Sequence, residues 1–158
     1  MRAEKATMSR KTIVLPDDFI YAMEYDVLYT DVNSANHLGA DRVLPIAMEA
    51  QLRFIKLLGY QNATAFEDAG LIMVHSEIQY VSEAVYGDRL KVELAIASIE
   101  DKSIELAYRI SHLSSNCEMA RILTTLLFYD YREKRAMVVP HTFLQAIDGS
   151  NTPLPDQT

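Results

Sequence analysis

The chain has 158 residues, 49% of them hydrophobic and 23% charged. This composition is ordinary for a globular protein, and the length is sufficient for one substantial core. The net charge of −7 and the pI near 5.0 argue against a nucleic-acid partner, because phosphate binding needs a basic face. The single cysteine excludes an internal disulfide, and the polar start of the chain shows no secretory signal, so we expect a cytoplasmic protein with no membrane partner.

The pattern along the chain predicts one domain. Residues 1–12 are charged and aperiodic, which is typical of a flexible arm, and the polar, proline-containing residues 149–158 indicate a disordered tail. We therefore expect a single folded domain over residues 13–148. Its first element is a strand at residues 21–30, where aromatic and aliphatic side chains alternate with polar ones.

Residues 41–58 predict a helix that is apolar over about two thirds of its circumference. Its polar residues form one narrow stripe, and its five charged residues argue against a membrane span. A helix of this kind must be covered on most sides, so we expect the sheet to wrap around it. Asp41 is the expected N-cap or first-turn acid, Pro45 is expected in the first turn, and Gly59 is expected to end the helix.

The second half of the chain changes to the period of a strand. Residues 71–84, 88–100, 103–113 and 119–131 predict four long strands in meander order, with a short helical turn before them at 62–69 and a short helix after them at 140–147. The order β–α–β–β–β–β is α+β, with a five-stranded antiparallel sheet. Large side chains on both faces of the last strand predict contact with another subunit.

Two segments carry a resemblance to a known family. Residues 31–40, DVNSANHLGA, lie without a gap over the signature Asp-x-Asp-x-x-Gly-His-Val-Asn-Asn of the hot-dog-fold acyl-CoA thioesterases of the 4-hydroxybenzoyl-CoA thioesterase-like group, and Glu49-Ala50-Gln51 falls where their central helix has a Glu-Ala-Arg-like segment. Residues 80–92, YVSEAVYGDRLKV, are similar to the strand, Gly-Asp turn and next strand of that family. The resemblance covers residues 20–145.

The resemblance implies a hot-dog fold, a homodimer or homotetramer with sheets joined edge to edge, and acyl-CoA bound between subunits. It also implies thioester hydrolysis without a cofactor. Backbone N–H groups at the start of the central helix would polarise the carbonyl, and a carboxylate would attack it or activate water. Leu38, Gly39 and Ala40 would lie in the turn that faces the substrate.

One departure from the family pattern affects the chemistry directly. The second aspartate of the signature is Asn33 here, and an amide cannot act as nucleophile or base, although it can hold a water or the carbonyl oxygen. His37, Glu49 and Asp31 are the candidates to replace the lost base. His37 is the best suited to neutral pH.

Each candidate also has a purely structural interpretation. His37 could hydrogen-bond to neighbouring backbone groups, Glu49 could pair with Arg53 four residues later, and Asn33 and Asp31 could simply form the turn. No Cys/His cluster and no glycine-rich phosphate loop supports a metal or nucleotide site. The sequence therefore predicts a thioesterase, with a non-hydrolytic protein that binds acyl-CoA or another small amphipathic ligand as the alternative.

Overall fold

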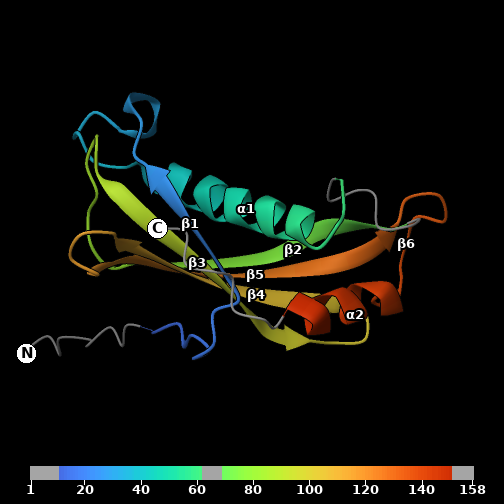
Figure 1. The fold of residues 1–158 in the computed structure, drawn as a ribbon. Coiled ribbons are helices and arrows are strands. Elements are labelled where there is room, and N and C mark those ends of the chain that lie inside the picture. Colours follow the sequence, from blue (N-terminus) through green and yellow to red (C-terminus); the bar gives the residue numbers. More distant parts are fainter. Residues whose placement is uncertain (1–10, 62–68, 151–158) are drawn as a thin grey trace, which may run out of the picture.

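The computed structural model describes residues 11–61 and 69–150, and one long helix lies across an antiparallel sheet (Figure 1). The sheet order is β1-β3-β4-β5-β2, with β6 paired to β5. The predicted α+β class and the predicted element order are confirmed. The elements are β1 (Tyr21–Asp26), a 3-10 turn (Tyr29–Asp31), α1 (Ala40–Leu57), β2 (Ala69–Tyr80), β3 (Arg89–Ile99), β4 (Ser103–His112), β5 (Glu118–Asp130), β6 (Arg135–Ala136) and α2 (His141–Ser150).

The position of β2 corrects the predicted meander. β3, β4 and β5 follow one another through two short turns, but β2 lies at the far edge and pairs with β5. The reason is that the free side of β3 is already taken by β1, with Tyr21 opposite Leu94 and Asp26 opposite Arg89. The segment 81–88 therefore crosses from one edge of the sheet toward the other, and this brings it beside the start of α1.

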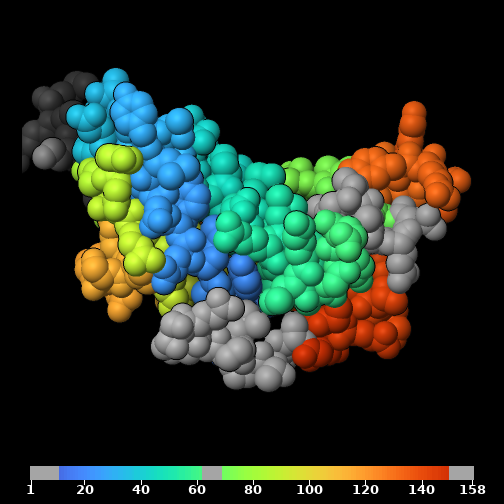
Figure 2. Space-filling view, turned by 45° about the horizontal axis from the view of Figure 1, so that its top comes forward, coloured from blue at the N-terminus to red at the C-terminus, as the bar shows by residue number. Residues whose placement is uncertain are grey.

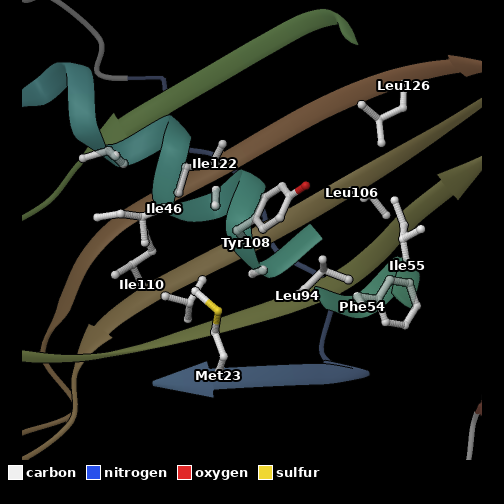
Figure 3. Packing of buried hydrophobic residues seen from close by; sticks show 14 of the residues in the cluster. Met23, Ile46, Phe54, Ile55, Leu94, Leu106, Tyr108, Ile110, Ile122 and Leu126 are labelled. Carbon is white, nitrogen blue, oxygen red and sulfur yellow. The ribbon is translucent and has the colours of Figure 1, made fainter. Parts of the chain in front are cut away.

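The hydrophobic core lies between α1 and one face of the sheet. Figure 3 shows Ile46, Phe54 and Ile55 from the helix pointing toward side chains of four strands. Tyr108 of β4 is fully buried there, and its hydroxyl contacts Gln51 Oε1 at 3.2 Å and Thr124 Oγ1 at 3.2 Å. The buried polar side chains of Tyr108, Gln51 and Thr124 therefore each have a hydrogen-bond partner.

The sheet covers one side of α1, and the opposite flank is less covered than the apolar circumference of the helix led us to expect. Figure 2 shows the outer side of α1 open at the surface, between the blue β1 and the red α2. Met48, Leu52 and Leu57 keep 38%, 40% and 52% of their surface exposed. A single sheet covers one face of a helix, so this apolar flank remains bare in the isolated chain. Among the residues that the structure describes, no helix has the length and apolar character needed to span a membrane.

Both ends of α1 show which sequence signals decide its limits. Gly39 is the N-cap, so of the two roles expected for Asp41 the structure confirms that of the first-turn acid. Pro45 is the sixth helical residue, beyond the predicted first turn. Pro45 therefore removes the N–H that would bond to the Asp41 carbonyl. At the other end Gly59 has φ +101°. The Gly59 N–H donates to the Lys56 carbonyl, and the Tyr60 N–H donates to the Ile55 carbonyl. This Schellman arrangement confirms the predicted role of Gly59.

The other boundaries differ by a few residues. The first strand ends at Asp26, because the chain turns into the 3-10 segment, and the strand predicted at 71–84 runs from Ala69 to Tyr80. The two-residue β6 makes the sheet six-stranded instead of five-stranded. Helix α2 continues to Ser150, two residues into the predicted tail. The predicted helical turn at 62–69, apart from Ala69, and most of the predicted arm and tail lie outside the described residues.

Candidate functional site

Three segments meet at the N-terminal end of α1. They are the loop of residues 27–39, the crossing segment 81–88 and the end of β2, and the two loops lie together at the left of Figure 1. His37 forms a β-bridge with Val85, and the N–H of Leu38 donates to the Ala84 carbonyl at 2.8 Å. The Tyr80 hydroxyl donates to the carbonyl of Ala40 at 2.9 Å. The start of the helix is thus held by segments 40 or more residues away along the chain.

The first turn of α1 presents unused backbone donors. The Gly39 N–H donates to the Asp31 carbonyl at 2.9 Å, and within the described residues the N–H groups of Ala40 and Asp41 have no acceptor. Such orphan groups carry the positive end of the helix dipole. Of the three predicted substrate-binding residues, Leu38 and Gly39 have engaged N–H groups, and only Ala40 has a free one.

Gly39 lies close to the Asp41 carboxylate. A Cβ at this position would lie 2.4 Å from Asp41 Oδ1, which is the end of a flexible side chain and can turn away. Asp41 lies in the first turn, where a negative charge is favourable. This keeps the N-terminal end of the helix compact beside its free N–H groups.

The Asn33 side chain organises the loop. Its Oδ1 accepts the N–H of Ala35 at 3.0 Å and that of His37 at 3.4 Å, as an Asx turn does. Asn36 has φ +62°, at the position where the resembling family has glycine, so this site needs a residue that tolerates the left-handed region. The amide oxygen of Asn33 is therefore directed at the backbone, as expected if Asn33 forms the turn.

His37 contacts a residue that the sequence did not single out. Its Nε2 lies 3.2 Å from Glu83 Oε2, with the His37 side chain 40% exposed. Glu83 belongs to the crossing segment, so only the tertiary fold brings the two together. A histidine and a carboxylate in contact form the kind of pair that can orient an imidazole for proton transfer.

Asp31 is buried and saturated with donors. Its carboxylate accepts from the Tyr25 hydroxyl at 2.7 Å, the Leu28 N–H at 2.9 Å and the Arg42 guanidinium at 3.1 and 3.2 Å. Burial acts to raise the pKa of Asp31, but these hydrogen bonds and the Arg42 charge outweigh it, and the pKa is lowered. A carboxylate with so many donors is a poor base, so the geometry favours the structural interpretation of Asp31.

Burial raises the pKa of Tyr25 to about 12, and the hydrogen bond to Asp31 adds to the effect. Tyr25 therefore stays neutral and donates its hydroxyl proton to the carboxylate. This fixes the exit of β1 relative to the first turn of α1, since Arg42 holds the same carboxylate from the helix side.

Glu49 lies in a different place from His37. A cavity of about 260 Å³ between β1 and α1 is lined by polar side chains, among them Tyr25, Asp31, Arg42, Glu49 and Arg53. Glu49 Oε1 accepts from Arg53 Nε at 2.8 Å, which confirms the predicted i,i+4 ion pair. The structure therefore divides the predicted residues into two groups: Asp31 with Glu49 in the cavity, and Asn33 with His37 on the loop.

Sequence reasoning missed three contributors, namely Glu83, Tyr80 and Arg42. The sequence pattern places Arg42 in the polar stripe of the helix. It places Tyr80 and Glu83 in the segment 80–92 that is similar to the family, without indicating a role for either. No local periodicity marks them, because their contacts are 11 to 46 positions away along the chain.

Comparison with known proteins agrees with this architecture. Residues 27–147 match the family model described as Thioesterase-like superfamily. A 1,4-dihydroxy-2-naphthoyl-CoA hydrolase from Synechococcus elongatus is 30% identical over 95 residues, which are 58% of this chain and 70% of that protein. The region matched by the family model includes the loop of residues 31–40.

Two solved structures show the same fold. A 1,4-dihydroxy-2-naphthoyl-CoA thioesterase from Synechocystis superposes with a TM-score of 0.75 at 25% identity, over 81% of this chain and 95% of that one. A Staphylococcus aureus protein in complex with CoA gives 0.77 at 16% identity, over 93% and 92% of the two chains. The predicted hot-dog fold is confirmed by these similarities.

Proposed function

The chain belongs to the Thioesterase-like superfamily, and on that premise we propose that it hydrolyses an acyl-CoA-type thioester to a free acid and a thiol. Its relatives include hydrolases and thioesterases named for CoA thioesters. The single cysteine leads us to propose the cytoplasm, a reducing compartment, as the place of this reaction.

The observation that carries this proposal is the pair of free N–H groups on Ala40 and Asp41. A thioester carbonyl placed against them gains two donors at the positive end of a helix of 18 residues. Preformed donors of this kind favour the oxyanion of the tetrahedral intermediate, and one donor alone is worth about 100- to 1000-fold in rate. The Tyr80 bond to the Ala40 carbonyl keeps this turn in place.

We assign the base to His37, which lies two residues before the N-cap. A water beside its imidazole gives up a proton to the ring nitrogen as its oxygen attacks the carbonyl carbon. When the intermediate collapses, the C–S bond breaks and the imidazolium returns the proton to the leaving thiolate. Glu49 is the alternative base, but it is held by Arg53 in the cavity on the β1 side of α1.

Aromatic acyl groups are the substrates we expect first. Two exposed tyrosines, Tyr29 and Tyr86, lie edge to face at this end of the molecule with ring centroids 6.3 Å apart. Their rings offer a surface on which a flat acyl group can stack. The named substrate of the similar hydrolase, 1,4-dihydroxy-2-naphthoyl-CoA, is also aromatic.

The alternative function is binding of acyl-CoA, or of another small amphipathic ligand, without hydrolysis. It is favoured by one observation, that Asn33 stands where the resembling family has its catalytic aspartate. On this alternative, wild-type protein binds acyl-CoA in calorimetry without turnover, and Asn33→Asp creates activity.

A thiol-release assay over aromatic and aliphatic acyl-CoAs separates the two functions. We expect turnover with the wild type, a loss of about 100-fold or more in kcat for His37→Ala, and less than a threefold change for Glu49→Gln. Because Glu49 pairs with Arg53, whose side chain is 54% exposed, Glu49→Gln serves as the matched change at the rival position. Absence of turnover with every acyl-CoA would refute hydrolysis, and a large loss in Glu49→Gln instead of His37→Ala would move the base to Glu49.

We also propose that two chains join through the edges of β2. This strand of 12 residues pairs on one side with β5 and lies at the edge of the sheet, and in Figure 2 its green surface adjoins that of α1. Val74 on β2 is 55% exposed and Met48 on α1 is 38% exposed. A long free edge next to an apolar surface is unfavourable for a lone chain, and pairing with a second copy covers both.

A further inference from the structure

Glu83 contacts His37 but has no role in the hydrolysis as proposed above. We infer that Glu83 is a positioning residue: its carboxylate holds the His37 ring with the proton on Nε2, and this leaves the Nδ1 lone pair free to take a proton from the attacking water. The inference rests on the proposed function, and it names the carboxylate and the nitrogen atom that this function needs.

The backbone of Glu83 is fixed from two directions. Its carbonyl accepts a hydrogen bond from His112 Nε2 at 2.9 Å, which ties it to the end of β4. The neighbouring Ala84 carbonyl accepts the N–H of Leu38 at 2.8 Å, which ties it to the loop that carries His37. The backbone of Glu83 is therefore held beside the loop that carries His37.

The His37 side of the contact is fixed as well. Residue 37 pairs with Val85 in a β-bridge, and the N–H of Val85 donates to Asp88 Oδ2 at 2.9 Å. Asp88 Oδ2 also lies 3.8 Å from the Nδ1 of His112. The imidazole and the carboxylate therefore project from two paired backbone segments, and His37 Nε2 lies 3.2 Å from Glu83 Oε2.

The chemistry of the two groups decides where the ring proton lies. An ionised carboxylate only accepts, so a proton shared across the 3.2 Å between His37 Nε2 and Glu83 Oε2 must be carried by the nitrogen. In the neutral ring the other nitrogen then carries the lone pair, which is the form a general base requires. After water has transferred its proton to Nδ1, the carboxylate lies beside the imidazolium and stabilises its charge until the proton passes to the leaving thiolate.

This role can be separated from folding stability. The side chains of His37 and Glu83 are 40% and 71% exposed. A contact between charged groups that is so open to water contributes little to stability. Substitutions of Glu83 are therefore expected to leave the fold intact and to act on the chemical step. Glu100, an exposed glutamate before β4 with no side-chain partner among the described residues, provides the matched control.

The kinetic test uses Glu83→Ala, Glu83→Gln and Glu100→Ala with the best acyl-CoA of the panel. Loss of an orienting partner of this kind typically costs 10- to 100-fold, so we expect Glu83→Ala to lower kcat about 10-fold with KM within twofold of wild type. Glu83→Gln keeps an acceptor oxygen and should recover part of the loss.

Glu100→Ala should match the wild type, and Glu83→Ala should have no further effect in a His37→Ala background. An unchanged kcat in Glu83→Ala, or a further loss in the His37→Ala background, would overturn the inference.

A measurement without substrate distinguishes failure of this inference from failure of the proposed function. Two-bond ¹H–¹⁵N correlation spectra at about pH 9, where imidazole is neutral, report which ring nitrogen carries the proton, and His37→Ala identifies the signals. We expect the Nε2–H form in the wild type and in Glu100→Ala, and a mixture of forms in Glu83→Ala. If the His37 ring of the wild type carries its proton on Nδ1, the inference is wrong even when the enzyme is active. A protein that is inactive on every thioester but shows the expected tautomer refutes only the hydrolysis.

Discussion

Replacing Asp31 with asparagine tests whether this residue is structural. Asparagine can leave its oxygen at the position of Oδ2, where it still accepts from the Tyr25 hydroxyl and the Leu28 N–H. Its NH₂ group then faces the Arg42 guanidinium, so both bonds to Arg42 and the ion pair are lost. Arg42 keeps 41% of its side chain exposed and can turn to water, which limits the loss.

The magnitude follows from these contacts. A hydrogen bond to a charged group contributes about 1.5–3 kcal/mol, and with the exposure of Arg42 taken into account we expect Asp31→Asn to lower the free energy of unfolding by about 2 kcal/mol. Asp31→Ala also leaves the partly buried donors of Tyr25 and Leu28 without this acceptor, and we expect a loss of about 3 kcal/mol. For a chain of this size the Asp31→Asn loss corresponds to a Tm lower by about 6 °C.

The pH dependence gives the sign of the effect. Because the pKa of folded Asp31 lies below its ordinary value of 3.8, its contribution is fully present above that value and disappears as the pH falls through the folded pKa. Asparagine does not titrate. The stability difference between wild type and Asp31→Asn should therefore be constant near neutral pH and shrink below about pH 4.

The assay is urea denaturation followed by circular dichroism, at one protein concentration and at several pH values. Asp26→Asn is the matched control, because Asp26 pairs with Arg89 at 3.2 Å but is 68% exposed, so a change of at most about 0.5 kcal/mol is expected. A loss in Asp31→Asn no larger than that of the control, or a difference that persists to about pH 3, would refute this account of Asp31.

Two further predictions concern the core and the edge of the sheet. Tyr108→Phe should lower the free energy of unfolding by about 1–3 kcal/mol, since it leaves Gln51 and Thr124 without their buried partner; thermal denaturation measures the effect, and a neutral result would contradict the assigned bonds. Val74→Lys on β2 should convert the wild-type oligomer to monomers in light scattering, because a charge at the edge strand opposes pairing. Val14→Lys, at a position that is 83% exposed and outside the sheet, is its control, and an intact oligomer in Val74→Lys would exclude the β2 edge as the interface.

Several features could be read from the residues alone because they depend on near neighbours in the chain. The apolar period of residues 41–58 predicted α1 to within one residue at each end. Gly59 was recognised as its end, and Glu49 was correctly paired with Arg53. Each of these signals operates within about one helical turn, so the sequence pattern contains all the partners involved.

The loop of residues 31–40 was found through its likeness to a family signature, and its internal geometry was not predicted. The positive φ of Asn36 and the turn made by Asn33 Oδ1 follow from the local sequence once the loop is closed. Pro45 was placed in the first turn because Asp41 was one candidate for the N-cap, whereas the helix begins at Ala40 after Gly39. Which residue caps the helix depends on how the preceding loop folds, and periodicity does not contain that information.

What the sequence by itself determined is the set of elements, their order, the family and the loop that carries the candidate residues. Only the tertiary structure decided that β2 lies against β5, that Glu83 reaches His37, and that Asp31 is buried under Arg42. The physical reason is that alternation tells which face of a strand is buried but not which strand lies beside it. Strand order is settled by competition for free edges across the whole sheet, and in this protein that competition brings the crossing segment to the start of α1.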